Sequence, residues 1–98
     1  MYLEKEILDK GLTAPRVTPE LVESVIVREK HYKFPETTVT ICLLELKNGF
    51  TVIGESACAS PENFDEELGR KIALDNARNK IWALEGYLLK QRAFDDEN

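Results

Sequence analysis

The sequence predicts an α+β fold, with an antiparallel sheet of three or four strands and a long C-terminal helix packed on one face. Two observations lead to this class. Two β-rich runs flank Asn48-Gly49 in "TTVTICLLELKNGFTVIGES", and an apolar stripe of helical period then extends from Pro61 to about Arg92. A hairpin followed by so long an amphipathic helix favours packing of the helix on the sheet.

The hairpin is the clearest element. Asn48-Gly49 suits a type I′ turn, in which both central residues have positive φ. Side chains of the first run alternate between two faces, one with Val39, Ile41, Leu43 and Glu45 and the other with Thr40, Cys42, Leu44 and Leu46. Both faces are largely apolar, and a short chain can hardly cover both. We therefore expect the protein to form homo-oligomers, as dimers or higher.

Two shorter elements are predicted before the hairpin. Thr18-Pro19 is typical of a helix start, with the threonine as N-cap and proline at the first helical position, and about two turns follow. Residues 25–34 alternate loosely and predict a third strand, with Pro35-Glu36 as a turn.

The long helix is predicted to begin at Pro61, with Ser60 as its cap and with Glu62 and Asp65 at the positive end of the helix dipole. Its apolar stripe comprises Phe64, Leu68, Ile72, Ala73, Ala77, Ile81, Leu84 and Leu88. Gly86 weakens a helix by about 1 kcal/mol relative to alanine. We expect a kink there, or close approach of another backbone.

Length and charge set limits on the function. The 98 residues predict one domain over residues 17–92, with an N-terminal arm (1–16) and an acidic tail (93–98). The net charge of −5 argues against binding a nucleic-acid polymer. The sequence has no apolar run long enough for a membrane span and no signal-peptide pattern, so we expect a cytoplasmic protein.

The sequence does not suggest an enzyme. Cys42 and Cys58 are expected to stay reduced, and the single histidine, His31, lies in a charged stretch that offers no evident base for either thiol. The cysteines and histidine lack the spacing of a metal site. Glu66 and Glu67 are adjacent and point to different sides of a helix. We expect no catalytic residues, no metal and no cofactor.

The loop between the hairpin and the long helix is the candidate site. Residues 55–61 are almost all small, and a helix N-terminus after such a loop can bind an anion through free N–H groups. Ser56 and Ser60 add hydroxyls, and Phe64 adds an aromatic ring on which a ligand could stack. The same pattern also fits a plain strand-to-helix turn followed by a core phenylalanine.

The segment from Leu46 to Leu89 also resembles the signature block of a family of small tailed-phage proteins. The resemblance rests on "LKNGF", "GESAC", "NFD", "IALDNA" and "IWALEGY", and it extends over roughly residues 17–92. That family in turn resembles the first type of Thoeris anti-defence protein. Such proteins are phage-encoded sponges that bind cyclic ADP-ribose isomers, and some bind cyclic oligonucleotides, so that an immune signal does not reach its effector in the host cytoplasm.

The resemblance implies a ligand with phosphate, ribose and purine. Asp65 would then accept from a ribose hydroxyl or hold a basic partner, while Asn76 contacts either the ligand or a neighbouring helix. The cations available on the helix are Arg70, near its start, and Lys90 and Arg92, near its end. Arg92 lies about 40 Å from Asp65 along a helix, so it could reach the site only from a neighbouring chain. Taken singly, each arginine is more often a solvated surface charge.

Two functions from different classes follow. The first is a sponge that sequesters a cyclic nucleotide signal without cleaving it. The alternative is a phage accessory or inhibitor protein that binds a host protein through its apolar sheet face or its helix. A small hydrolase is the least favoured, because no nucleophile, metal or paired-carboxylate constellation is evident.

Overall fold

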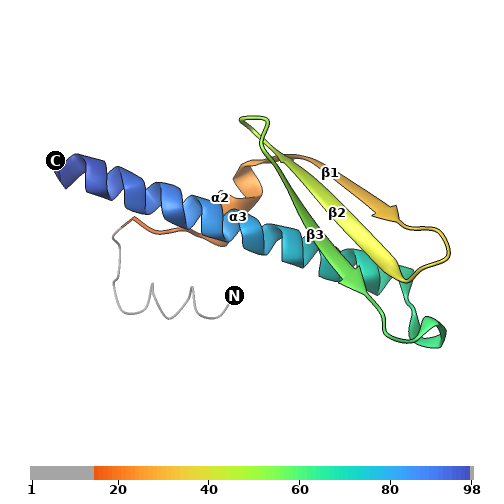
Figure 1. Ribbon diagram of the computed structural model, residues 1–98. Coiled ribbons are helices and arrows are strands. Elements are labelled where there is room, and N and C mark those ends of the chain that lie inside the picture. The colour runs from red at the N-terminus through yellow and green to blue at the C-terminus, as the bar shows by residue number, and fades with distance from the viewer. Residues whose placement is uncertain (1–14, 98) are drawn as a thin grey trace.

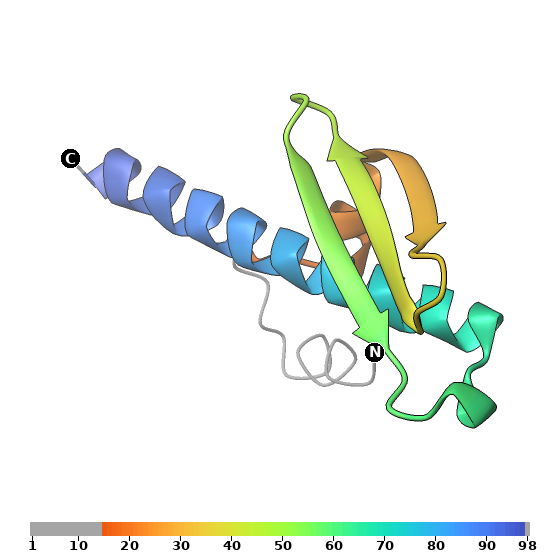
Figure 2. The ribbon, with the colours of Figure 1, turned by 45° about the vertical axis from the view of Figure 1, so that its right-hand side comes forward.

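The computed structural model describes residues 15–97 (Figures 1 and 2). The elements follow in the order α2 (Pro19–Ser24), β1 (Ile26–Lys33), β2 (Val39–Leu46), β3 (Thr51–Ala57), the short 3-10 helix η1 (Pro61–Asn63) and α3 (Glu66–Glu97). The predicted α+β class, with an antiparallel sheet and a long C-terminal helix, is confirmed. The predicted N-terminal arm lies outside the described residues except for its last two positions.

The sheet has three strands in the order β1-β2-β3, and both pairings are antiparallel. Helix α3 packs across β3 and β2 on one face, as Figure 2 shows. The alternation along β2 places Thr40, Cys42, Leu44 and Leu46 on this covered face, where all four are buried. On the other face, which we call the open face, Tyr32 and Ile53 are exposed, and they flank the half-buried Ile41 and Leu43.

The core is small and lies between α3 and the sheet. Its buried hydrophobic residues are Val22, Cys42, Leu44, Leu46, Val52, Ala73, Ala77 and Ile81. Gly54 of β3 sets the distance between the layers, because a Cβ at this position would lie 2.2 Å from the Ala73 carbonyl oxygen and 2.2 Å from the Ala77 nitrogen. Only glycine permits this contact between strand and helix backbone.

Side chains of α3 also cover the outer edge of β3. Asn76 donates from Nδ2 to the Glu55 carbonyl at 2.7 Å, and the Lys80 ammonium donates to the Ile53 carbonyl. These two carbonyls point away from β2, where an edge strand normally presents unpaired acceptors.

The turn between β2 and β3 differs from the predicted type I′ turn. Gly49 has φ +89°, whereas Asn48 is not among the residues with positive φ. The Gly49 N–H donates to the Leu46 carbonyl at 2.9 Å, and the Leu46 N–H donates to the Phe50 carbonyl at 2.8 Å. This is the pattern of a three-residue loop, a type I turn closed by a glycine bulge, which needs positive φ only at the glycine.

The N-terminus of the long helix also differs from the prediction. Ser60 and Pro61 begin η1 rather than α3, and Ser60 makes no side-chain cap hydrogen bond. Phe64 is extended, and α3 begins at Glu66, where Asp65 Oδ1 accepts from the Leu68 N–H at 3.1 Å. Asp65 therefore has the role that the sequence pattern assigned to Ser60, because aspartate is an equally good cap at a later position.

The buried stripe of α3 is narrower than the predicted stripe. Ala73, Ala77 and Ile81 are buried, whereas Leu68, Ile72 and Leu88 are each more than two-fifths exposed. The helix runs without interruption through Gly86, where a Cβ would meet no atom within 4 Å, and it continues to Glu97 (Figure 1). Its second half extends beyond the sheet.

Candidate functional site

The loop between β3 and α3 borders a cavity of about 210 Å³ that brings three predicted site residues together. Ser56, Phe64 and Asp65 all line it, with Thr38, Cys58 and Gly69 among the other lining residues. Strand β3 supplies Ser56, whereas the extended link between η1 and α3 supplies Phe64 and Asp65. We call this cavity the Phe64 pocket.

Hydrogen bonds from three side chains hold the walls of the Phe64 pocket. The Thr38 hydroxyl donates to the Cys58 carbonyl at 2.6 Å and accepts from the Cys58 N–H at 3.2 Å. The Ser56 hydroxyl donates to the Gly69 carbonyl at 2.7 Å, and the Cys58 thiol donates to the Ser60 carbonyl at 3.1 Å. The small residues of the loop thus fit a tightly bonded turn.

Phe64 also lines a second cavity, which shares Thr38 and Cys58 with the Phe64 pocket. The second cavity has a volume of about 510 Å³ and is lined by Lys33, Glu36, Thr37, Thr38, Val39, Cys58, Ala59, Pro61 and Phe64. The Lys33 ammonium lies 5.4 Å from the centroid of the Phe64 ring, within the range of a cation–π contact. Sequence reasoning missed Lys33, although alternation along β1 would have placed it on the same face as His31.

Carboxylates dominate the helix start. Asp65 caps α3, and Glu66 and Glu67 occupy its first turn. Nearby, the Ser60 hydroxyl donates to Glu62, and this hydrogen bond lowers the pKa of the Glu62 carboxyl. The helix dipole is already compensated by these groups. A phosphate in the Phe64 pocket would therefore depend on cations from outside α3's first turn, such as Lys33.

The remaining predicted site residues lie elsewhere. Ser60 lines neither cavity, and Asn76 is bonded to the edge of β3. Arg70 pairs with Glu66 at 3.7 Å on the side of α3 that faces β1. Lys90 and Arg92 lie on the overhanging half of α3, and Arg92 is about 40 Å from the Phe64 pocket at 1.5 Å per residue. One chain does not bring Arg92 and Phe64 together.

Neither cysteine is paired, and Cys42 is not an activated nucleophile. Its partner across the sheet is His31, but burial, together with the nearby Glu29 carboxylate, raises the pKa of the Cys42 thiol to about 11. The thiol is therefore protonated near neutral pH. His31 instead contacts Glu29, with 2.8 Å between Nε2 and Oε2.

Within residues 15–97, no cluster of three or more histidine, cysteine, aspartate or glutamate side chains is placed to hold a metal ion. Over the same range, no helix has the length and apolar character needed to cross a membrane.

A comparison with protein families finds a match over most of the chain. The model described as "Phage protein (N4 Gp49/phage Sf6 gene 66) family" matches residues 17–93, which include every described element from α2 to most of α3. No curated protein and no solved structure matches the chain.

Proposed function

The chain belongs to the phage protein (N4 Gp49/phage Sf6 gene 66) family, and we propose that it binds a cyclic nucleotide signal in the host cytoplasm and sequesters it uncleaved. The proposal rests mainly on the position of Phe64, because this aromatic residue lines both cavities and has the Lys33 ammonium beside its ring. A purine needs a ring to stack on, and its phosphate needs a cation within reach.

The two cavities suit a ligand of this class. Small-molecule sites usually have volumes of about 300–1,000 Å³. The Phe64 pocket, at about 210 Å³, is somewhat smaller, and the second cavity, at about 510 Å³, falls within this range. In the proposed complex a purine packs against Phe64, and a ribose hydroxyl donates to Asp65. Lys33 then contacts a phosphate. Cyclic ADP-ribose isomers and cyclic oligonucleotides carry all three groups, in line with the resemblance to Thoeris anti-defence proteins.

The proposed site is completed by a second chain. The pocket's own surroundings are rich in carboxylates, whereas Arg92 lies on an exposed part of α3 that extends beyond the sheet. In an antiparallel pair of α3 helices, the C-terminal half of one helix meets the N-terminal half of the other. Arg92 of the neighbouring chain then supplies a second cation for the ligand phosphate.

Calorimetry with purified protein tests the proposal. Titration with cyclic ADP-ribose isomers and cyclic oligonucleotides should show tight binding, and the ligand released on heating should be chemically unchanged. Lys33→Gln and Arg92→Ala should each weaken binding about 10- to 100-fold, the usual effect of losing a charge-assisted contact. Lys71→Gln is the matched control, since Lys71 is exposed, pairs with Glu67 and lines neither cavity.

If the parent binds none of these ligands, the cyclic nucleotide proposal is wrong. If the parent binds and Arg92→Ala binds equally well, the site lies within one chain.

The open face of the sheet supports a second candidate, a phage accessory protein that binds a host protein. Tyr32, Ile53 and Phe34 are each more than two-fifths exposed, and Tyr32 and Phe34 pack edge to face at 5.1 Å. Exposed aromatic and aliphatic side chains in one patch are typical of an interface. If this candidate is correct, the protein binds no nucleotide. Pull-downs with the parent protein should recover a specific host partner, and pull-downs with Ile53→Lys should lose it.

A further inference from the structure

A small cavity lies between β1 and the first turns of α3, on the side of α3 away from the β3 edge. Helix α3 covers β2 and β3, so strand β1 lies beside the helix rather than beneath it (Figure 2). The cavity has a volume of about 80 Å³ and is lined by His31, Tyr32, Lys33, Thr40, Glu66 and Arg70. Because about 15 Å³ admits one water, this volume has room for a tetrahedral oxyanion.

Two buried polar atoms of the lining residues have no hydrogen-bond partner among the described residues. Thr40 is 1% exposed, and its Oγ1 is unpartnered. Nδ1 of His31 is also buried and unpartnered. Leaving a buried polar group unpaired costs stability, so such groups usually serve a ligand or water. A valine at position 40 would fill the same space without this cost.

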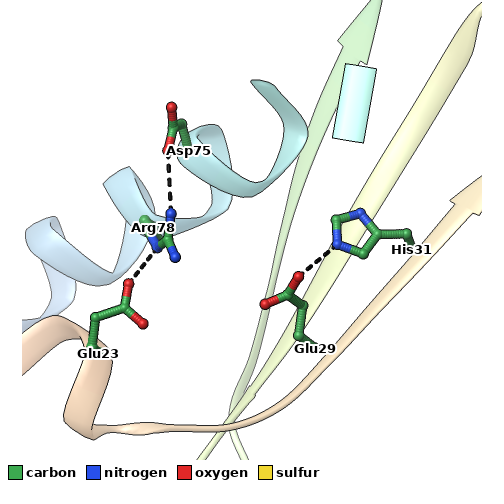
Figure 3. A network of polar contacts seen from close by, with 5 residues as sticks. All are labelled: Glu23, Glu29, His31, Asp75 and Arg78. Atoms are coloured by element: carbon green, nitrogen blue, oxygen red, sulfur yellow. Dashed lines mark hydrogen bonds and ion pairs between the residues drawn. The ribbon is translucent and has the colours of Figure 1, made fainter. Parts of the chain in front are cut away.

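His31 is held in a defined state by Glu29. Both side chains project from β1 toward α3, and the contact runs from Nε2 to the Glu29 carboxylate (Figure 3). The carboxylate keeps a proton on Nε2, so Nδ1 gains its own proton only when the ring is charged. When the ring is charged, Nδ1 carries an N–H group that can donate a hydrogen bond to an anion.

Arg70 is the cation of this cavity whose present ion pair is easily broken. It pairs with Glu66 at 3.7 Å across one helical turn, and both side chains are at least half exposed. Exposed pairs of this kind are weak, so an incoming anion can replace Glu66 at little cost. Farther along α3, Arg78 is held by both Glu23 and Asp75, as Figure 3 shows, and is less available.

We propose that this cavity is an oxyanion site for a phosphate group, held by the Thr40 hydroxyl, His31 Nδ1 and the Arg70 guanidinium. Two carboxylates border the site. Glu29 stays on His31 Nε2, whereas Glu66 swings into solvent when Arg70 turns to the anion. Lys33 lines both this cavity and the larger cavity beside Phe64, so the phosphate comes either free from solution or as part of a larger ligand.

The chain offers a direct probe, because His31 is its only histidine. We would record the imidazole proton and nitrogen resonances of the full-length protein while adding inorganic phosphate, with sodium chloride at equal ionic strength as the reference. We expect a saturable shift of the His31 resonances with phosphate, including the nitrogen change at Nδ1 that marks protonation, and no such shift with chloride.

Three variants make the test specific. Thr40→Val should weaken phosphate binding about tenfold, as expected for loss of one hydrogen bond to a charged group, while melting at or above the parent's temperature. Arg70→Gln should weaken it at least as much. Lys71→Gln removes a neighbouring positive charge that points away from the cavity, so its phosphate affinity should equal the parent's.

Unchanged His31 resonances at saturating phosphate would overturn the proposal. So would an unchanged affinity in both Thr40→Val and Arg70→Gln, or an equal loss in Lys71→Gln, which would indicate a general charge effect. Competition with a cyclic dinucleotide identifies the source: displacement of phosphate assigns the site to a larger ligand, and its absence assigns the site to the free anion. Phosphate binding without cyclic nucleotide binding would leave this site standing and remove only the function proposed above.

Discussion

At the scale of single residues, glycines on the two main layers have opposite roles. A Cβ on Gly54 would lie 2.2 Å from backbone atoms of α3, whereas a Cβ on Gly86 would meet no atom within 4 Å. The first glycine is required by packing. The second is only a weak point in a helix, because glycine lowers helix stability relative to alanine.

These two positions give a matched pair of substitutions. Gly54→Ala should destabilise the protein by about 3 kcal/mol or more, because backbone atoms of Ala73 and Ala77 must move apart from β3. Gly86→Ala should instead stabilise it by about 1 kcal/mol. Urea unfolding followed by circular dichroism measures both, and a Gly54→Ala protein as stable as its parent would contradict the packing described for these layers.

At the scale of elements, the start of α3 defines the geometry of the Phe64 pocket. The break at residues 64–65, between η1 and α3, turns the Phe64 ring toward the loop and leaves Asp65 as the helix cap. A helix that began at Pro61 would have placed Phe64 in its first turn. The pocket therefore depends on the cap at Asp65.

The cap can be tested with a pair of alanine substitutions. Asp65→Ala should cost about 1 kcal/mol of stability, the usual effect of losing an N-cap, because the Leu68 N–H loses its acceptor. Ser60→Ala should cost much less, since the Ser60 hydroxyl makes no cap hydrogen bond and donates only to the exposed Glu62. Thermal or urea unfolding distinguishes the two; a larger loss for Ser60→Ala would mean that the helix begins earlier.

The elements differ in how far they could be predicted. Alternation along β2 predicted which side chains share a face, because the pattern has period two. It did not predict which face α3 covers, because both faces are largely apolar. The predicted start of α3 at Pro61 was wrong. Ser60-Pro61 and Asp65 both satisfy the preferences for a helix N-terminus, and the local sequence does not show which of them begins the long helix. Lys33 and Thr40 were missed at the site because strand register, not sequence spacing, brings β1 and β2 beside α3.

At the scale of the whole molecule, the chain is elongated. Its extents are 53 × 32 × 19 Å and its radius of gyration is 16.7 Å, compared with about 13 Å for a compact domain of this length. The overhanging half of α3 accounts for the difference (Figure 1). Tyr87, Leu88 and Phe94 are exposed on it, and they add to the apolar side chains of the open face.

Self-association follows as a prediction from this shape. Light scattering at micromolar concentration should give at least twice the mass of one chain, because exposed apolar surface on both sheet and helix favours burial against another copy. Ile53→Lys, on the open face, should shift the protein toward monomer. Val27→Lys serves as control, since Val27 is also exposed but lies at the irregularity in β1, outside the strand register. A monomeric parent would rule out the cross-chain role of Arg92.

The hydrogen bonds from Asn76 and Lys80 to the outer carbonyls of β3 have a consequence for growth of the sheet. A neighbouring strand that approached β3 would find the Glu55 and Ile53 acceptors already occupied, so hydrogen-bonded extension is directed to β1, the opposite border. A fibril built by strand pairing needs two free sheet edges in each subunit, one for each neighbour. A subunit with one blocked border can join a single neighbour through its strands, and such growth ends at a pair.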